Sequence, residues 1–194
     1  MKQGEIKRKT AETDIELSLN LDGGACSIDT GVGFFDHMLT LFAGHSGFGL
    51  IVKCVGDSFV DDHHSVEDVG ICLGLAFREA LSDMRGITRY GSIILPMDEV
   101  LVLCSVDVSG RSCLCFDLPV SAKKIGTYDA ELTKEFFEAF TRSAGITLHL
   151  KKLYGENSHH IVEAGFKAFS RSLAAAVKID PDKKTQIPST KGVL

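Results

Sequence analysis

Hydrophobic positions alternate with polar ones in some segments of the chain and recur every three or four residues in others, which predicts both strands and helices. In the first half, the segment 13–21 (TDIELSLNL) alternates as a half-buried strand does, and the LDGG sequence that follows predicts a hairpin turn. Helical spacing predicts helices over 33–47 and 64–84, and a strand over 49–57 separates them.

The second half repeats this order of elements. Residues 98–118 predict two strands joined at an SG turn. Helical spacing resumes over 134–145 and 159–177, on either side of a strand at 145–153. We interpret the chain as an internal duplication of one strand–strand–helix–strand–helix unit.

Each half, over about residues 5–86 and 91–178, has an apolar face that it must bury. Face-to-face packing of the halves is the simplest solution, so we expect one α+β domain over 1–194 instead of two independent domains. The final stretch, 179–194, is polar and predicts an irregular tail.

The composition restricts the classes of protein and partner. The chain has 194 residues, 44% hydrophobic and 24% charged, as is ordinary for a globular protein. It has no apolar run long enough to cross a bilayer, and its N-terminus lacks the apolar segment of a signal peptide, so we expect a cytoplasmic protein without a membrane partner. A net charge of −5 argues against a nucleic-acid partner. Six cysteines lie mostly inside apolar runs without CxxC spacing, which favours reduced core thiols over disulfides or a zinc site.

The sequence His-His-x-x-Glu occurs twice, in DDHHSVED (61–68) and in NSHHIVEA (157–164). Alignment of the two halves on this motif pairs further residues that can bind metals. The aligned pairs are His63 with His159, His64 with His160, Glu67 with Glu163, His37 with Glu135, and Glu12 with Asp98.

Helix geometry suggests how these residues are used. The glutamate of each motif shares a helix face with either histidine, but adjacent residues project roughly 100° apart. The two imidazoles of one pair are therefore suited to two different metals, unlike those of HExxH, which face one zinc. Eight candidate ligands suffice for two metals with open positions: His37, His63, His64, Glu67, Glu135, His159, His160 and Glu163.

Imidazole and carboxylate donors without thiolate suit Mn²⁺, Fe²⁺ or Zn²⁺, and octahedral sites with open positions favour manganese. The alternative is two helix N-termini whose histidines and acids only cap the helix and contact solvent. Two motifs in register, with a third aligned pair upstream, favour the metal interpretation.

Dense, ordered motifs also carry a resemblance: GVGFFDHML, GDSFVDDHHSVED, RYGSIILPMDE, SGR, LYGENSHHIVEAGFKA and IPSTKG. From about Arg8 to the C-terminus the chain closely resembles the imidazoleglycerol-phosphate dehydratases of histidine biosynthesis. The resemblance implies dehydration of D-erythro-imidazole-glycerol phosphate to imidazole-acetol phosphate with two Mn²⁺ per active site. It also implies helices packed between two mixed four-stranded sheets, and a 24-subunit homo-oligomer with active sites between subunits.

The resemblance assigns roles to particular residues. It maps metal ligands onto the histidines and glutamates named above, although the family commonly has a histidine where this chain has Glu135. It places Glu12 and His45 near the reacting carbons, and we interpret Asp98, the counterpart of Glu12, as an orienting acid near the substrate. The residues that it implies for phosphate recognition are Arg89, Arg111, Lys167, Ser189 and Lys191.

Each of these residues also has an ordinary structural interpretation. Lys167 and Arg111 are alternatively solvated charges, Arg89 a helix cap, and His45 a histidine satisfied at a helix end. The STKG sequence is a flexible tail if read alone, whereas the family resemblance implies that it orders over bound phosphate. Cationic side chains supply the charge-assisted hydrogen bonds that a phosphate requires.

The implied reaction removes a hydroxyl and a neighbouring hydrogen with no carbonyl to stabilise a carbanion. Our hypothesis is that two metals bridge the ring nitrogens of the substrate, that the resulting imidazolate expels the hydroxyl, and that Glu12 transfers the protons. Two other functions compete with this hypothesis. A dinuclear metallohydrolase would release phosphate from an ester, and a structural subunit would use closed metal sites to hold an oligomer together.

Overall fold

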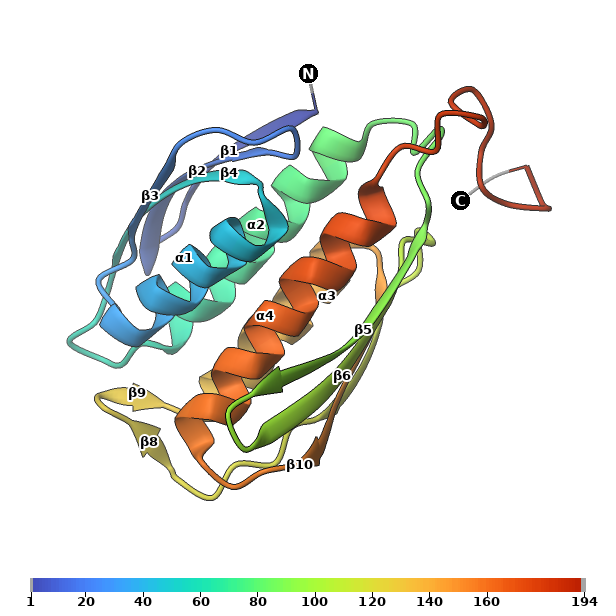
Figure 1. Cartoon of the computed structure of the whole chain (residues 1–194). Helices are drawn as coiled ribbons and strands as arrows, with labels where there is room; N and C mark the ends of the chain where they lie inside the picture. Colours follow the sequence, from blue (N-terminus) through green and yellow to red (C-terminus); the bar gives the residue numbers. More distant parts are fainter. Residues whose placement is uncertain (1, 193–194) are drawn as a thin grey trace.

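The computed structural model describes residues 2–192, in which two four-stranded sheets enclose four helices (Figure 1). The elements of the first half are β1 (Gln3–Lys9), β2 (Thr13–Asn20), β3 (Cys26–Asp29), α1 (Gly33–Ser46), β4 (Gly49–Gly56) and α2 (His63–Leu81). Those of the second half are β5 (Tyr90–Met97), β6 (Val100–Asp107), β7 (Cys113–Asp117), β8 (Lys124–Ile125), β9 (Tyr128–Asp129), α3 (Leu132–Ala144), β10 (Thr147–Tyr154) and α4 (Ser158–Val177). The predicted α+β class, with helices between two mixed sheets, is confirmed.

The two large sheets have the same strand order. The first is β1-β2-β4-β3 and the second is β5-β6-β10-β7. In each sheet the last strand pairs in parallel with its neighbour, β3 with β4 and β7 with β10, while the other pairs are antiparallel. A short ribbon, β8-β9, is inserted before α3.

This topology corrects three expectations. The LDGG hairpin is wrong, because β4 lies between β2 and β3. The two strands predicted within 98–118 exist, but β10 separates them, so the SG sequence does not join a hairpin. The repeating unit also has one strand more than predicted, because β1 and β5 precede the strands that we recognised. Both are edge strands with mostly exposed or half-buried side chains, so their hydrophobic pattern is weak.

The helices pack closely against the sheets at corresponding glycines. A Cβ on Gly4 of β1 would overlap the carbonyl oxygen of Ala76 in α2, and a Cβ on Gly91 of β5 would overlap that of Ser172 in α4. Ala76 and Ser172 occupy equivalent positions in the aligned halves. Aromatic rings join the helices of the two halves. Phe42 of α1 stacks on Phe169 of α4, with the ring centroids 5.6 Å apart.

Two further expectations concern the surface. Cys54, Cys72 and Cys104 are buried as predicted, but Cys26, Cys113 and Cys115 are exposed, because they lie on the outer faces of the edge strands β3 and β7. No helix within residues 2–192 is both long and apolar enough to cross a membrane.

Candidate functional site

Three of the predicted ligands meet where α1 lies against the start of α4. One nitrogen or oxygen atom from each of His37, His159 and Glu163 lies within 4.8 Å of the others, the only such group of metal-binding side chains in the part of the chain that the structure describes. His159 Nε2 is 3.1 Å from Glu163 Oε2, and His37 Nε2 is 3.9 Å from the same oxygen. His37 is 49% exposed, so this triad is open on one side.

The carboxylate of Glu163 is the buried member of the triad, and it is held ionised. Its other oxygen, Oε1, pairs with Lys167 Nζ at 2.5 Å, one helical turn further along α4. Burial opposes ionisation, but the hydrogen bond and charge of Lys167, together with His37 and His159, outweigh burial and lower the pKa of Glu163. The charged form is the form that binds a cation.

His64, at the start of α2, has a carboxylate at each ring nitrogen. Its Nδ1 is 3.0 Å from Asp57 Oδ2, and its Nε2 is 3.6 Å from Glu12 Oε1. The hydrogen bond to Asp57 is the main reason that the pKa of His64 is raised. The backbone N–H of Asp57 also donates to the carbonyl oxygen of Glu12, so the end of β4 and the turn between β1 and β2 are tied together beside the imidazole.

His160, its counterpart in α4, has the same arrangement. Its Nδ1 is 2.8 Å from Glu99 Oε2, and its Nε2 is 3.8 Å from Asp98 Oδ2. The hydrogen bond between His160 and Glu99 raises the pKa of the imidazole and lowers that of Glu99 to about 2. The alignment of Glu12 with Asp98 thus corresponds to a shared geometry, since each acid faces Nε2 of the second histidine in its half.

Adjacent imidazoles diverge as the helix geometry predicts. The ring planes of His63 and His64 are inclined by 85° and those of His159 and His160 by 83°, with centroids 6.1 Å and 6.2 Å apart. In the second pair, His159 belongs to the triad, whereas His160 faces the turn between β5 and β6.

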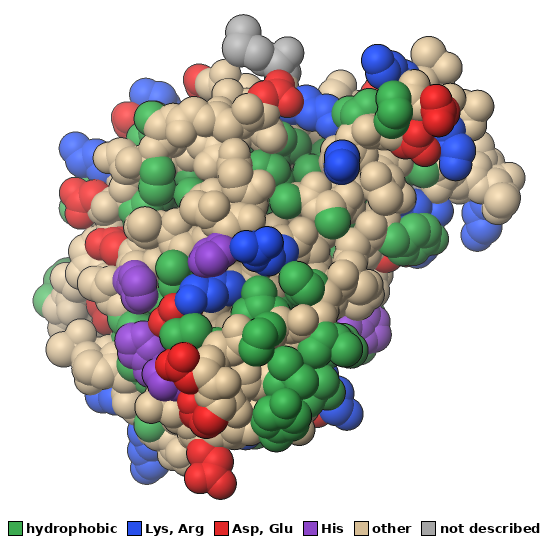
Figure 2. Space-filling view, viewed as in Figure 1, with side chains coloured by type: hydrophobic (Ala, Val, Ile, Leu, Met, Phe, Trp, Pro, Cys, Tyr) green, Lys and Arg blue, Asp and Glu red, His purple; other side chains and the backbone are tan. Residues whose placement is uncertain are grey.

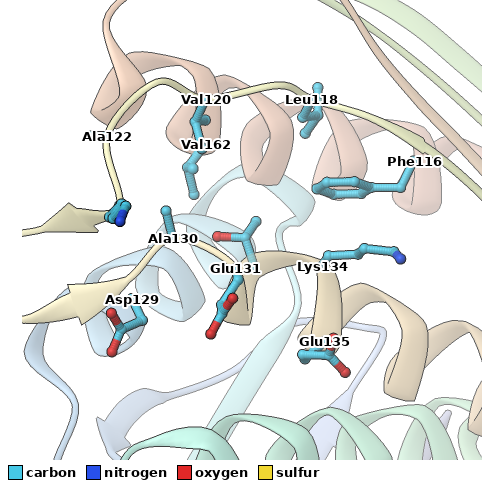
Figure 3. A pocket seen from close by; sticks show the side chains of 12 residues that line it. Phe116, Leu118, Val120, Ala122, Asp129, Ala130, Glu131, Lys134, Glu135 and Val162 are labelled. Atoms are coloured by element: carbon cyan, nitrogen blue, oxygen red, sulfur yellow. The ribbon is translucent and has the colours of Figure 1, made fainter.

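The remaining predicted ligands lie apart from the triad. His63 Nε2 is 3.6 Å from Glu67 Oε2 on α2, and Arg142 of α3 reaches Glu67 Oε1 at 3.3 Å. Glu135, in the first turn of α3, lies at the rim of a cavity of about 570 Å³ whose wall includes Phe116, as Figure 3 shows. No histidine lines this cavity, and all seven are in the described part of the chain.

His45 does not adjoin the other histidines. It lies in the last turn of α1, about 12 Å along the helix from His37 at 1.5 Å per residue. Burial and the nearby charges of Lys167 and Arg171 lower its pKa. Figure 2 shows histidine side chains gathered with basic and acidic side chains on one face of the molecule.

Arg89 and Arg111 share one carboxylate at the far end of the second sheet. Arg89 Nε donates to Asp107 Oδ1 at 2.8 Å, and Arg111 Nη2 is 3.8 Å from Asp107 Oδ2. Arg89 Nη1 also donates to the carbonyl oxygen of Pro188 at 2.9 Å, so its guanidinium holds the tail and does not cap a helix.

The predicted residues of the tail, Ser189 and Lys191, follow this anchor. Lys191 N–H donates to Ser189 Oγ at 3.2 Å. Upstream, Arg85 donates to the carbonyl oxygen of Thr185 and the backbone N–H of Gly86 donates to that of Gln186, so the segment is attached at several points. Residues 180–192 form no helix or strand, and the end of this segment extends away from the two sheets at the upper right of Figure 1.

The triad and the paired arginines are at opposite ends of α4. Arg89 N–H donates to the carbonyl oxygen of Ala176 near the end of this helix, whereas Glu163 lies near its start. At about 1.5 Å per residue these positions are roughly 20 Å apart. One small ligand cannot contact both sets of residues in a single chain.

Three residues near the candidate site were not recognised in the sequence. Asp57 contacts His64 of the first motif and Glu99 contacts His160 of the second. Arg171 lies one turn beyond Lys167 on α4. Glu99 is adjacent to Asp98, and Asp57 is the last residue of the strand predicted over 49–57, but spacing alone does not bring either to a histidine. Arg171 could have been recognised from the sequence, because it follows Lys167 by four residues and residues at i and i+4 share a helix face.

Comparisons with known proteins agree with this fold. A family model described as imidazoleglycerol-phosphate dehydratase matches residues 30–173. Proteins of that name from Azorhizobium caulinodans and Prochlorococcus marinus are 56% and 53% identical over the whole of this chain and 99% and 97% of their own lengths.

Solved structures of the same kind superpose on the chain. The dehydratase from Staphylococcus aureus has a TM-score of 0.85 at 42% identity, covering 92% of this chain and 99% of that one. IGPD from Pyrococcus furiosus, in complex with (S)-C348, has a TM-score of 0.82 at 38% identity, covering 97% and 100%. Fold and sequence together define a hydro-lyase, an enzyme that removes water. The chain belongs to the imidazoleglycerol-phosphate dehydratase family, the dehydratases of histidine biosynthesis.

Proposed function

We propose that the chain dehydrates D-erythro-imidazole-glycerol phosphate to imidazole-acetol phosphate at a dinuclear manganese centre shared between subunits. The observation that carries this proposal is the triad of His37, His159 and Glu163; the other motif, at the start of α2, offers the same donor types. Family membership supports the overall reaction. The metals, the roles of individual residues and the assembly form the rest of the proposal.

The donor set fits a divalent ion. Two imidazoles and an ionised carboxylate within 4.8 Å, without a thiolate, match the ligands that manganese accepts. The triad would hold one ion, and His63, His64, Glu67, Glu135 and His160 would supply ligands for completing two sites. Bound manganese would act as a Lewis acid toward the ring nitrogens of the substrate and favour loss of the ring N–H proton.

Glu12 is suited to proton transfer at the neighbouring carbons. Its carboxylate is half exposed, stands 3.6 Å from His64 Nε2, and is attached to a turn that is tied to Asp57. A group in this position can reach a ligand bound at the histidines while its protons exchange with solvent. It would take the proton from the carbon that keeps its hydroxyl, next to the carbon whose hydroxyl leaves as water, and the resulting enol would then tautomerise to the ketone.

Phosphate recognition supports a shared site. Lys167 lies beside the triad in the same chain, whereas Arg89, Arg111, Ser189 and Lys191 are at the other end of α4. The glycerol chain of the substrate is far shorter than this separation. If all of these residues bind one substrate, a second copy must supply the arginines and the tail, which supports a homo-oligomer and is compatible with the 24-subunit shell.

A product assay tests the proposal against its two rivals. Purified protein would be supplied with Mn²⁺ and imidazole-glycerol phosphate, and both ketone and free phosphate would be measured. We expect ketone without phosphate release, lost in His64→Ala and retained in His149→Ala, a control that removes an exposed histidine of β10 outside both motifs. Phosphate without ketone would favour the hydrolase, and neither product from metal-loaded protein would favour structural metals.

A further inference from the structure

The second histidine of each motif is held at Nδ1 by a carboxylate that lies outside the motif. His64 Nδ1 is 3.1 Å and 3.0 Å from the two oxygens of Asp57, and His160 Nδ1 is 2.8 Å from Glu99 Oε2. Because a carboxylate accepts hydrogen bonds, this contact places the N–H on Nδ1. The lone pair of the neutral ring is then on Nε2, the nitrogen that faces Glu12 in one half and Asp98 in the other.

Both carboxylates are themselves held in position. The backbone of Asp57 donates to the carbonyl oxygen of Glu12 and accepts from the N–H of Val60, and its side chain is only 15% exposed. Glu99 Oε1 accepts from the backbone N–H of Asn157, whose side chain caps α4. Each carboxylate therefore links its histidine to a fixed part of the backbone.

The two carboxylates occupy different places in the aligned halves. Asp57 follows β4, whereas Glu99 lies in the turn between β5 and β6. Internal duplication alone would not produce this match, because the residues do not correspond in the alignment. Carboxylates from two unrelated positions thus accept a hydrogen bond from Nδ1 of the second histidine in each motif. This indicates a functional requirement at His64 and His160.

We infer that Asp57 and Glu99 are positioning residues that orient His64 and His160, so that Nε2 of each ring is presented to a divalent cation. This inference rests on the proposed metal centre and deepens it. A carboxylate behind a metal-binding histidine fixes the tautomer and the ring orientation and increases the basicity of the ligand. Neither residue touches the substrate in this scheme.

The test measures Mn²⁺ affinity directly, from the electron paramagnetic resonance signal of the free ion during titration of the whole assembly. Asp57→Ala and Glu99→Ala are expected to weaken binding about 10- to 100-fold, the usual effect of removing such a partner. Asp57→Asn and Glu99→Gln, which keep an acceptor oxygen, should recover part of this loss. The matched control is Glu16→Ala, whose exposed carboxylate on β2 pairs with Lys7 and not with a histidine; it should bind Mn²⁺ as the wild type does.

Thermal unfolding of the metal-free variants separates positioning from general stability. A positioning role predicts that affinity falls in the order wild type, Asn or Gln, Ala, without a matching order of unfolding temperatures. Affinity that simply follows the unfolding temperature across the series overturns the inference, as does wild-type affinity in both Ala variants. A wild-type protein that binds no Mn²⁺ contradicts the proposed metal centre itself.

Discussion

Glu12 Oε1 lies 3.6 Å from Nε2 of His64, although the two residues are in different elements of the first half. In the second half Asp98 has the same relation to His160, at 3.8 Å. The two acids differ in reach by one methylene. We expect the longer one to perform the proton transfers.

Glu12→Gln should lower kcat by about 10²- to 10⁴-fold, the usual contribution of a general acid or base. The Mn²⁺ content and the size of the assembly should not change, because the amide has nearly the same shape. Steady-state kinetics and metal analysis check both. Asp98→Asn is the matched variant and should lower kcat much less; a Glu12→Gln enzyme with near-normal kcat would remove Glu12 from the mechanism.

Glu163→Gln should remove one metal from each chain. The substitution takes the ionised carboxylate from the triad and leaves Lys167 without its partner, so both the ligand and the local charge balance are lost. Metal analysis after gel filtration should show about half the wild-type Mn²⁺ content, and activity should be lost. Glu138→Gln, on the exposed face of α3, is the control and should keep both properties. Full metal occupancy in Glu163→Gln would contradict the role of the triad.

Two inactive variants should restore activity when their subunits are mixed. Arg111 and Glu163 lie at opposite ends of the second half, so a shared site would take each from a different chain. Arg111→Ala and Glu163→Gln would be dissociated together and reassembled, which produces some sites with both native residues. Recovery of dehydratase activity is expected, with each variant reassembled alone as the control. Persistent inactivity of a correctly sized mixed assembly would indicate that one chain supplies the whole site.

Chelation should dissociate the assembly if metals are shared between subunits. Removal of metal leaves histidines and glutamates without the ion that joins them, and analytical ultracentrifugation should then detect smaller species. Return of Mn²⁺ should restore the original size. An assembly that survives complete metal removal would show that contacts outside the metal centre suffice for oligomerisation.

Gly91→Ala should destabilise the fold. The added Cβ would overlap the carbonyl oxygen of Ser172, so α4 must move away from β5, and overpacking of this kind costs at least about 1–3 kcal/mol. Urea denaturation measures the change. Gly44→Ala on the exposed side of α1 is the control, because a Cβ there has nothing within 4 Å and alanine favours a helix by about 0.5–1 kcal/mol. Equal stabilities would mean that the contact between β5 and α4 is not close in solution.

The helices were predictable because each one buries a continuous face of side chains at helical spacing. The edge strands were not, since β1 carries mostly charged residues and β5 is exposed along much of its length. Strand order was also beyond prediction from pattern. A turn sequence such as LDGG reverses the chain, but it does not decide whether the flanking strands β2 and β3 pair. Here β4, which comes later in the sequence, lies between them.

The sequence by itself determined the four helices, the repeated motif and the donor types, because hydrophobic period and ligand chemistry are local properties of the chain. It also implied the divergence of neighbouring imidazoles, since this follows from helix geometry alone. Only the tertiary structure decided which residues meet. His37 reaches Glu163 because α1 packs on α4, while Asp57 and Glu99 reach their histidines because loops from separate strands end beside the helix starts. Such contacts depend on how the whole core packs, and the spacing of residues along the chain does not encode them.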